Sequence, residues 1–75
     1  MRKVVTPEVK LRAQSALDSS PIYALRDLCV EQDEFDEEML CISGRVDSFY
    51  HKQLAQEVVR SVADGFRVVN SIRVR

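Results

Sequence analysis

The chain of 75 residues contains no tryptophan, two glycines, two prolines, two cysteines and one histidine, and its apolar residues occur in short groups. A membrane-spanning helix needs about 18 or more consecutive apolar residues, so the sequence predicts no such helix. Residues 1–7 include two basic side chains but no apolar segment of the length that a signal peptide requires. We therefore expect a cytoplasmic protein if the chain is complete.

The scarcity of cysteine and histidine argues against several kinds of reactive site. Cys29 and Cys41 are too far apart for a CxxC redox pair, and a zinc site would need two further ligands where the chain has one histidine. The two thiols would pair in an oxidising compartment and stay reduced in a cytosol, and the sequence leaves this open. His51 has no nucleophile and carboxylate arranged around it, so we expect a surface residue. We expect no enzyme, no metal and no cofactor.

The net charge is only −1, but the charged residues are unevenly distributed. Six of the twelve acidic residues fall between Glu31 and Glu38, which leaves six acids against eleven Lys and Arg in the rest of the chain. An acidic segment on a mildly basic body predicts a dipolar domain. The basic part suits an anionic lipid or a protein surface, and it is too weakly basic to indicate nucleic-acid binding.

Length and composition predict a small folded domain. Hydrophobic residues make up 45% of the chain and charged residues 31%, which is typical of a globular protein rather than a disordered one. A chain this short buries only about 60% of its unfolded surface, so its core is modest. We expect a single domain over residues 1–75, with the core within about 7–74.

The sequence predicts two helices. The first is expected over 7–17, with Thr6 as the N-cap and a proline at the first helical position. The second is expected over 49–63, with Ser48 as the N-cap. Gly65 can adopt the left-handed conformation that closes this second helix.

Alternating apolar residues predict three strands, near 28–31, 40–46 and 68–74. The acidic segment 33–38 contains no glycine, so a loop of about four to six residues should join the first two strands in an antiparallel hairpin. The second helix should form a right-handed crossover between the second and third strands, which then run parallel. The predicted fold is therefore α+β, in the order αββαβ, with two helices packed on one face of a three-stranded sheet. Which strand is central is not decided.

The second half of the chain contains a series of residues in a characteristic order and spacing: Leu40, Ile42, Gly44, Val46, Ser48, Lys52, Ala55, Val58, Gly65, Val68, Asn70, Ile72 and Val74. In this order and spacing they resemble the BON domain, a family named for bacterial OsmY and nodulation proteins. The resemblance covers about residues 9–74 and implies an αββαβ module, often in envelope proteins, that contacts phospholipid or other proteins. It implies an envelope-associated protein if the chain is a piece of a longer one. The long acidic loop 33–38 departs from the family's short turn, which argues against membrane contact by this tip.

Four residues are assigned structural roles: Gly44, Ser48, Gly65 and Asn70. Gly44 interrupts the apolar side of a strand, and we expect its backbone to lie directly under the second helix. Asn70 falls on the buried side of the last strand, where an amide without partners is costly. We expect its side chain to hydrogen-bond the backbone near the turn that follows Gly65.

Several residues are candidates for contact with a partner. The predicted contact residues are Arg45, Phe49, Tyr50, Lys52, Val69, Arg73 and Arg75. The three arginines alternate with the apolar side of their strands and should lie on the open face of the sheet, with Val69, Met39 and Cys41. Of Phe49 and Tyr50, one is expected to pack in the core and the other to lie at the rim near Lys52.

The acidic loop has two interpretations. Its carboxylates could hold a cation, but the calcium-loop pattern with its glycine is absent, so a solvated tip is favoured. Those carboxylates are Asp33, Glu34, Asp36, Glu37 and Glu38. Phe35, in the middle of the loop, either folds back onto the core or presents an exposed apolar contact.

These observations lead to a hypothesis of a non-catalytic binding module of BON type that engages a protein partner or an anionic phospholipid membrane. The alternative is a structural domain that forms homo-oligomers through the open sheet face. The sequence lacks a glycine-rich phosphate clamp and stacking aromatic motifs, so we expect no nucleic-acid partner.

Overall fold

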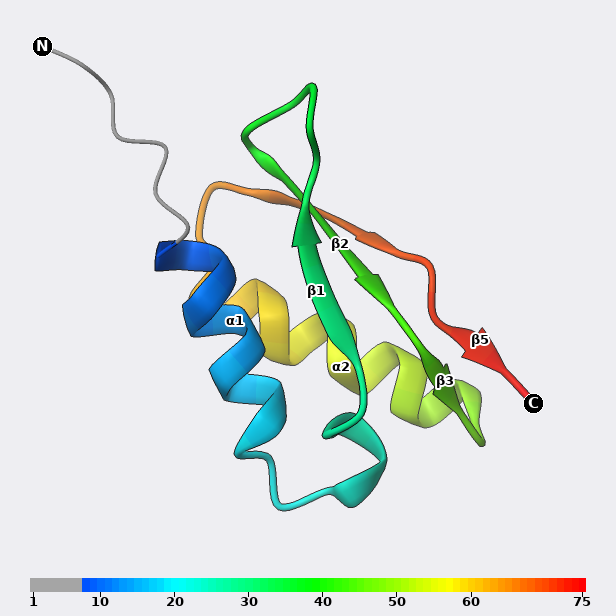
Figure 1. Cartoon of the computed structure of the whole chain (residues 1–75). Helices are drawn as coiled ribbons and strands as arrows, with labels where there is room; N and C mark the ends of the chain where they lie inside the picture. Colours follow the sequence, from blue (N-terminus) through cyan, green and yellow to red (C-terminus); the bar gives the residue numbers. More distant parts are fainter. Residues whose placement is uncertain (1–7) are drawn as a thin grey trace, which may run out of the picture.

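The computed structural model describes residues 8–75, and the predicted helix start at Thr6 lies outside them. The helical segments are α1 (Glu8–Asp18), the short 3-10 helix η1 (Tyr23–Leu25) and α2 (Phe49–Val62). The strands are β1 (Cys29–Gln32), β2 (Met39–Ser43), β3 (Arg45–Val46), β4 (Arg67–Asn70) and β5 (Arg73–Val74). Both α-helices lie on the same side of the strands (Figure 1), so the predicted α+β fold is confirmed.

β2 is the central strand of the sheet, with β1 antiparallel on one side and β4 parallel on the other. The parallel pair β3–β5 continues the ladder of β2 and β4, with Arg45 opposite Arg73. The continuing bonds run from the amides of Ser71, Arg73 and Arg75 to the carbonyl oxygens of Ile42, Gly44 and Val46. The three predicted strands therefore correspond to β1, to β2 with β3, and to β4 with β5.

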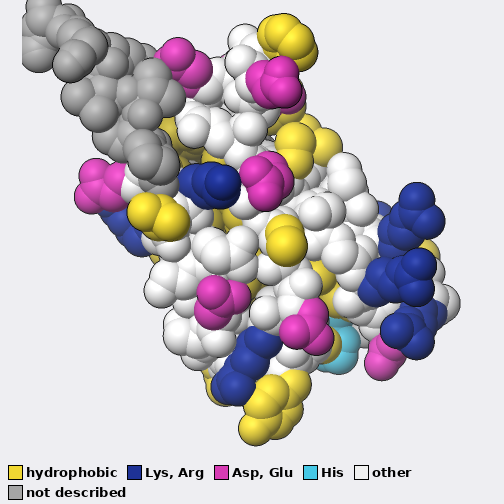
Figure 2. Space-filling model, viewed as in Figure 1, with side chains coloured by type: hydrophobic (Ala, Val, Ile, Leu, Met, Phe, Trp, Pro, Cys, Tyr) yellow, Lys and Arg dark blue, Asp and Glu magenta, His cyan; other side chains and the backbone are white. Residues whose placement is uncertain are grey.

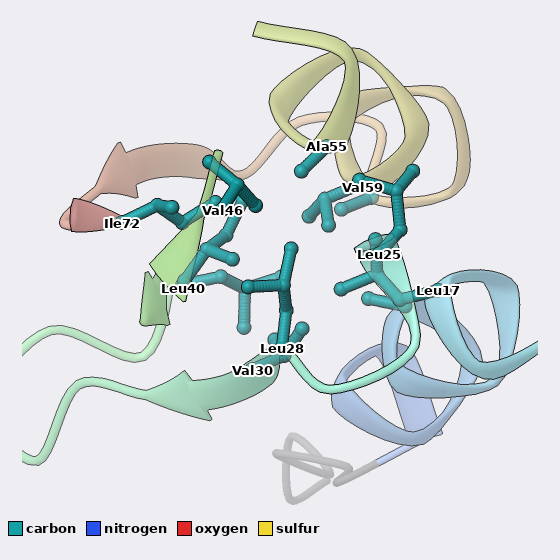
Figure 3. Packing of buried hydrophobic residues seen from close by; sticks show 12 residues of the cluster. Leu17, Leu25, Leu28, Val30, Leu40, Val46, Ala55, Val59 and Ile72 are labelled. Atoms are coloured by element: carbon teal, nitrogen blue, oxygen red, sulfur yellow. The ribbon is translucent and has the colours of Figure 1, made fainter. Parts of the chain in front are cut away.

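The core lies between the inner face of the sheet and the apolar stripes of the two helices (Figure 3). Its members are Ala13, Leu17, Leu25, Leu28, Val30, Leu40, Ile42, Val46, Ala55, Val59, Ala63 and Ile72. Alternate residues of β2 and β3 point inward because strand side chains change face at every residue. Full burial of a leucine or valine side chain contributes roughly 1.5–3 kcal/mol, so these few residues supply most of the favourable free energy.

Gly44 separates β2 from β3 with a φ of +131°, a conformation that side chains rarely adopt. The expectation that its backbone lies under the second helix was wrong. A Cβ at this position would meet Leu28, with its Cδ2 at 2.6 Å and its Cα at 3.4 Å, and the carbonyl oxygen of Asp27. The segment just before β1, rather than α2, therefore requires a glycine here.

α2 begins and ends as its sequence predicts. Ser48 Oγ accepts a hydrogen bond from the amide of His51 at 3.2 Å, which satisfies one free donor of the first turn. At the other end, the amide of Ala63 donates to the carbonyl oxygen of Val59, and Gly65 has a φ of +86°. The N-cap role predicted for Ser48 is confirmed. Gly65 has the expected left-handed conformation, but it lies in the turn after the helix, where the amide of Phe66 donates to the carbonyl oxygen of the C-cap Ala63.

Asn70 is half-buried and fully hydrogen-bonded, but its partners are not near the turn after Gly65 as expected. Its Nδ2 donates to the carbonyl oxygen of Lys52 at 2.9 Å and to Gln56 Oε1 at 3.1 Å. Its Oδ1 accepts from the amide of Ile72 at 3.2 Å. Asn70 therefore links the junction of β4 and β5 to the first turns of α2.

The outer edge of β1 is covered in part by a side chain of α1. Gln14 Nε2 donates to the carbonyl oxygen of Leu28 at 2.8 Å, and its Oε1 accepts from the amide of Val30 at 2.9 Å. These two bonds occupy backbone groups that an edge strand otherwise leaves free to pair with another chain.

Candidate binding surface at the β3–β5 end

The short parallel pair β3–β5 carries a dense group of positive side chains. Arg45 and Arg73 lie directly opposite each other on neighbouring strands, and Arg75 follows on the same side of β5. All three are exposed, while the residues that alternate with them are less so: Val46 is buried and Val74 is half-buried. Adjacent strands are about 4.8 Å apart, so the guanidinium groups of Arg45 and Arg73 share one small region of the surface.

These arginines have few compensating charges. The side chains of Arg45 and Arg73 make no hydrogen bond or ion pair with any residue in 8–75, and Arg75 Nε lies 3.6 Å from Asp47 Oδ1. The Arg75–Asp47 pair is largely solvent-exposed, and such pairs contribute little because water screens them. Figure 2 shows the Lys and Arg side chains gathered at this end, where Arg45, Arg73, Val74 and Arg75 line a shallow hollow. The arginine end, as we name the surface of Arg45, Arg73 and Arg75, is therefore strongly positive.

Two exposed aromatic rings lie beside the arginine end. α2 starts three residues after β3, and its first two residues, Phe49 and Tyr50, are 74% and 67% exposed. The expectation that one of them packs in the core was wrong. Counting back from the buried Ala55 by three or four residues gives Lys52 and His51, so the inward stripe of the helix misses both aromatic positions.

Two other predicted contact residues lie apart from this surface. Lys52 is half-buried on the inner stripe of α2, and its carbonyl oxygen accepts the bond from Asn70. Val69 is 40% exposed on β4, four residues before Arg73, which is about 13 Å along a strand. The structure therefore brings together five of the seven predicted residues: Arg45, Phe49, Tyr50, Arg73 and Arg75.

Val69 belongs to a second surface, the open face of the three-stranded sheet. It lies opposite the half-buried Cys41, and Met39 precedes Cys41 on the same side of β2. Cys29 is exposed on β1, and neither cysteine forms a disulfide. A hollow at the β4 edge of the sheet lies between this strand and α2, and it is lined by Met39, Gln56, Arg60, Phe66, Arg67, Val68 and Val69.

His51 is half-buried rather than fully exposed. Its ring centroid lies 5.6 Å from that of Tyr50, and its Nδ1 is buried without a hydrogen-bond partner in the described part of the chain. No nucleophile contacts it among the bonds of residues 8–75. Its backbone amide helps to fix the first turn of α2, because it donates to Ser48 Oγ.

The acidic loop uses two of its carboxylates to hold its own shape. Asp33 Oδ2 accepts from the amides of Phe35 and Asp36 at 2.9 and 2.8 Å, and Asp36 Oδ1 accepts from the amide of Glu38 at 3.0 Å. Asp36 also forms an ion pair with Arg67 of β4. Within residues 8–75 no three His, Cys, Asp or Glu side chains are grouped to hold a metal. Phe35 is 92% exposed, so of its two alternatives the structure shows the exposed one.

Comparison with protein-family models and with curated protein sequences finds no match. The resemblance to BON domains therefore depends on the residue pattern of 40–74 alone. Neither helix of the described residues is long and apolar enough to cross a membrane.

Proposed function

We propose that this protein is a non-catalytic binding module that attaches to anionic phospholipid membranes through the arginine end, with Phe49 and Tyr50 at its rim. The observation that carries the proposal is the cross-strand pair of Arg45 and Arg73. Like charges directly opposite on neighbouring strands destabilise a sheet, and no acidic residue in 8–75 pairs with either arginine. A phosphate-bearing surface would relieve this repulsion and form charge-assisted hydrogen bonds with both guanidinium groups.

The aromatic rings favour a lipid surface over a small soluble anion. Phe49 and Tyr50 expose large apolar areas next to the positive charges. Aromatic side chains concentrate at the level of lipid headgroups, and each basic residue near an anionic leaflet contributes about 1 kcal/mol. The resemblance of residues 40–74 to BON domains supports the same proposal, since that family is associated with phospholipid contact. As a member of such a family, the protein would act at the cell envelope.

Vesicle co-sedimentation tests this proposal. We expect the protein to bind vesicles of phosphatidylcholine that contain phosphatidylglycerol, and not vesicles of phosphatidylcholine alone. The double variant R45Q/R73Q should lose most binding, because it removes the two arginines of this end whose side chains have no acidic partner in 8–75. F49S should weaken binding without abolishing it, because it removes an apolar contact and leaves the charges intact.

A matched control is R12Q, which removes one exposed arginine from α1, far along the chain from β3 and β5. It should bind anionic vesicles as the wild type does. Equal binding by R45Q/R73Q and R12Q would show that the arginine end is not the lipid contact, and absence of binding by the wild type at low salt would refute membrane attachment.

A second candidate is a structural domain that associates through the open sheet face, and the half-buried Met39 and Cys41 beside the exposed Val69 favour it. V69K would place a charge in the middle of that contact. If this face holds copies of the chain together, V69K should convert an oligomer to a monomer in sedimentation velocity, whereas R45Q/R73Q should not.

A further inference from the structure

The two charged surfaces of the molecule lie at opposite ends of the same strands. The acidic loop precedes Met39 at the start of β2, and the arginine end begins at Arg45 of β3. Seven or eight residues of extended chain separate them, which is roughly 25 Å. Figure 1 shows the hairpin tip and the β3–β5 pair at opposite limits of the sheet, so no single molecule can bring the two together.

The acidic tip presents an apolar side chain between carboxylates. Asp33 and Asp36 are turned toward the loop backbone, so the outward part of the tip is made by Glu34, Phe35 and Glu38, all of which are exposed. Glu34 has no ion pair or hydrogen bond with other residues of the described range. Figure 2 shows acidic side chains around this end of the molecule.

The arginine end has the complementary composition. Arg45, Arg73 and Arg75 surround a hollow whose lining includes the half-buried Val74. The charges of the two surfaces are opposite in sign, and each surface has one apolar side chain among its charged ones: Phe35 at the tip and Val74 in the hollow. Arg–carboxylate pairs are among the stronger charge-assisted contacts because the guanidinium can bind both oxygens.

We propose that the arginine end of one molecule binds the acidic tip of a second copy, with Phe35 directed into the hollow between the arginines. Because the two surfaces differ, the contact is head-to-tail, and successive copies form an open chain or a ring rather than a closed twofold dimer. The interface is small and rich in charge, so the association is weak and sensitive to salt. This inference does not depend on lipid binding.

Sedimentation velocity without lipid tests the proposal. At low salt the mean mass of the wild type should rise with concentration above the 8.6 kDa of one chain. It should return to one chain at about 1 M salt, where the screening length falls to about 3 Å. The tip variant E34Q/F35S and the end variant R45Q/R73Q should each remain monomeric at low salt, because each lacks one of the two surfaces.

Mixing the two variants gives the sharpest result. The tip variant keeps a native arginine end and the end variant keeps a native tip, so an equal mixture should form a 1:1 dimer that grows no further. Glutamine and serine are used instead of reversed charges, so that the altered surfaces cannot attract each other. Circular dichroism of each variant shows whether loss of association is due to loss of folding.

Three outcomes would overturn the proposal. The first is a wild type that stays monomeric at every concentration in low salt, which would show that the arginine end does not bind a second copy. The second is self-association that both variants retain, which would point to the open sheet face. The third is a mixture of the two folded variants that contains no dimer.

Discussion

At the scale of single residues, Gly44 is the most constrained position of the sheet. Its φ of +131° strains any other residue, and a Cβ would come within 2.6 Å of Leu28 Cδ2. We expect Gly44→Ala to lower the free energy of unfolding by about 2–4 kcal/mol, as strain and overpacking together. Gly65→Ala is the control, since Gly65 has a φ of +86° and open space around it, and its cost should be about 1 kcal/mol. Urea denaturation measures both, and equal losses would contradict the role of Leu28.

Asn70 shows why the hydrogen-bond partners of a buried amide are hard to predict. Its position on the inner side of the last strand follows from the alternation of β4, and that part of the prediction is confirmed. Its partners, Lys52 and Gln56, come from a helix whose rotation over the sheet the sequence does not specify. The same limit applies to Gly44. The alternation of residues shows which side of the strand Gly44 faces, but it does not show that Leu28 packs against it.

Asn70→Asp tests this link between α2 and the last strands. Aspartate keeps the acceptor for the amide of Ile72 but loses the donor to the carbonyl oxygen of Lys52. We expect the free energy of unfolding to fall by about 1–3 kcal/mol near neutral pH, because a half-buried carboxylate would then face that carbonyl oxygen. Thermal unfolding followed by circular dichroism measures the loss, and a variant as stable as the wild type would show that the amide donor contributes nothing.

At the scale of elements, the periodic segments were the most predictable. The helix over 49–63 and the three strands match the structure because each buries a stripe or a face whose period is visible in the sequence. The start of α2 was predictable from Ser48, whereas the exposure of Phe49 and Tyr50 was not, since hydrophobic character alone favoured a buried ring. β2 is central because the hairpin and the crossover both use it.

The edge strand β1 depends on a side chain of α1 that no motif in the sequence singles out. Gln14 forms two bonds to the backbone of Leu28 and Val30, much as a further strand would. Gln14→Ala should cost about 1–3 kcal/mol and should speed hydrogen exchange at the amide of Val30, because both groups lose their partner. Gln53→Ala is the control: within residues 8–75 the Gln53 side chain bonds only to Glu57 on the exposed side of α2, so its loss should change neither quantity. Unchanged exchange at Val30 in the Gln14 variant would contradict this role.

At the scale of the whole molecule, the separation of charge matters more than the net charge of −1. The uneven distribution was visible in the sequence as an acidic segment, but the concentration of positive charge was not. Arg45 and Arg73 are 28 positions apart and become neighbours only through the parallel register of β3 and β5. The register of β3 and β5 therefore explains why Arg73 lies directly opposite Arg45, which spacing in the sequence does not show.

The repulsion at the arginine end has a consequence for stability that requires neither lipid nor a second copy. Arg73→Gln removes one of two opposed charges, so at low salt and low protein concentration we expect unfolding to cost about 0.2–1 kcal/mol more than in the wild type. The difference should vanish at about 1 M salt, because screening then removes the repulsion in the wild type. Arg12→Gln should lower the free energy of unfolding slightly or leave it unchanged, since it removes an i,i+4 pair with Glu8. Urea denaturation at two salt concentrations measures all three proteins. A less stable Arg73→Gln would mean that the packing of the arginine stem outweighs the repulsion, and the cross-strand pair would then no longer favour an anionic partner.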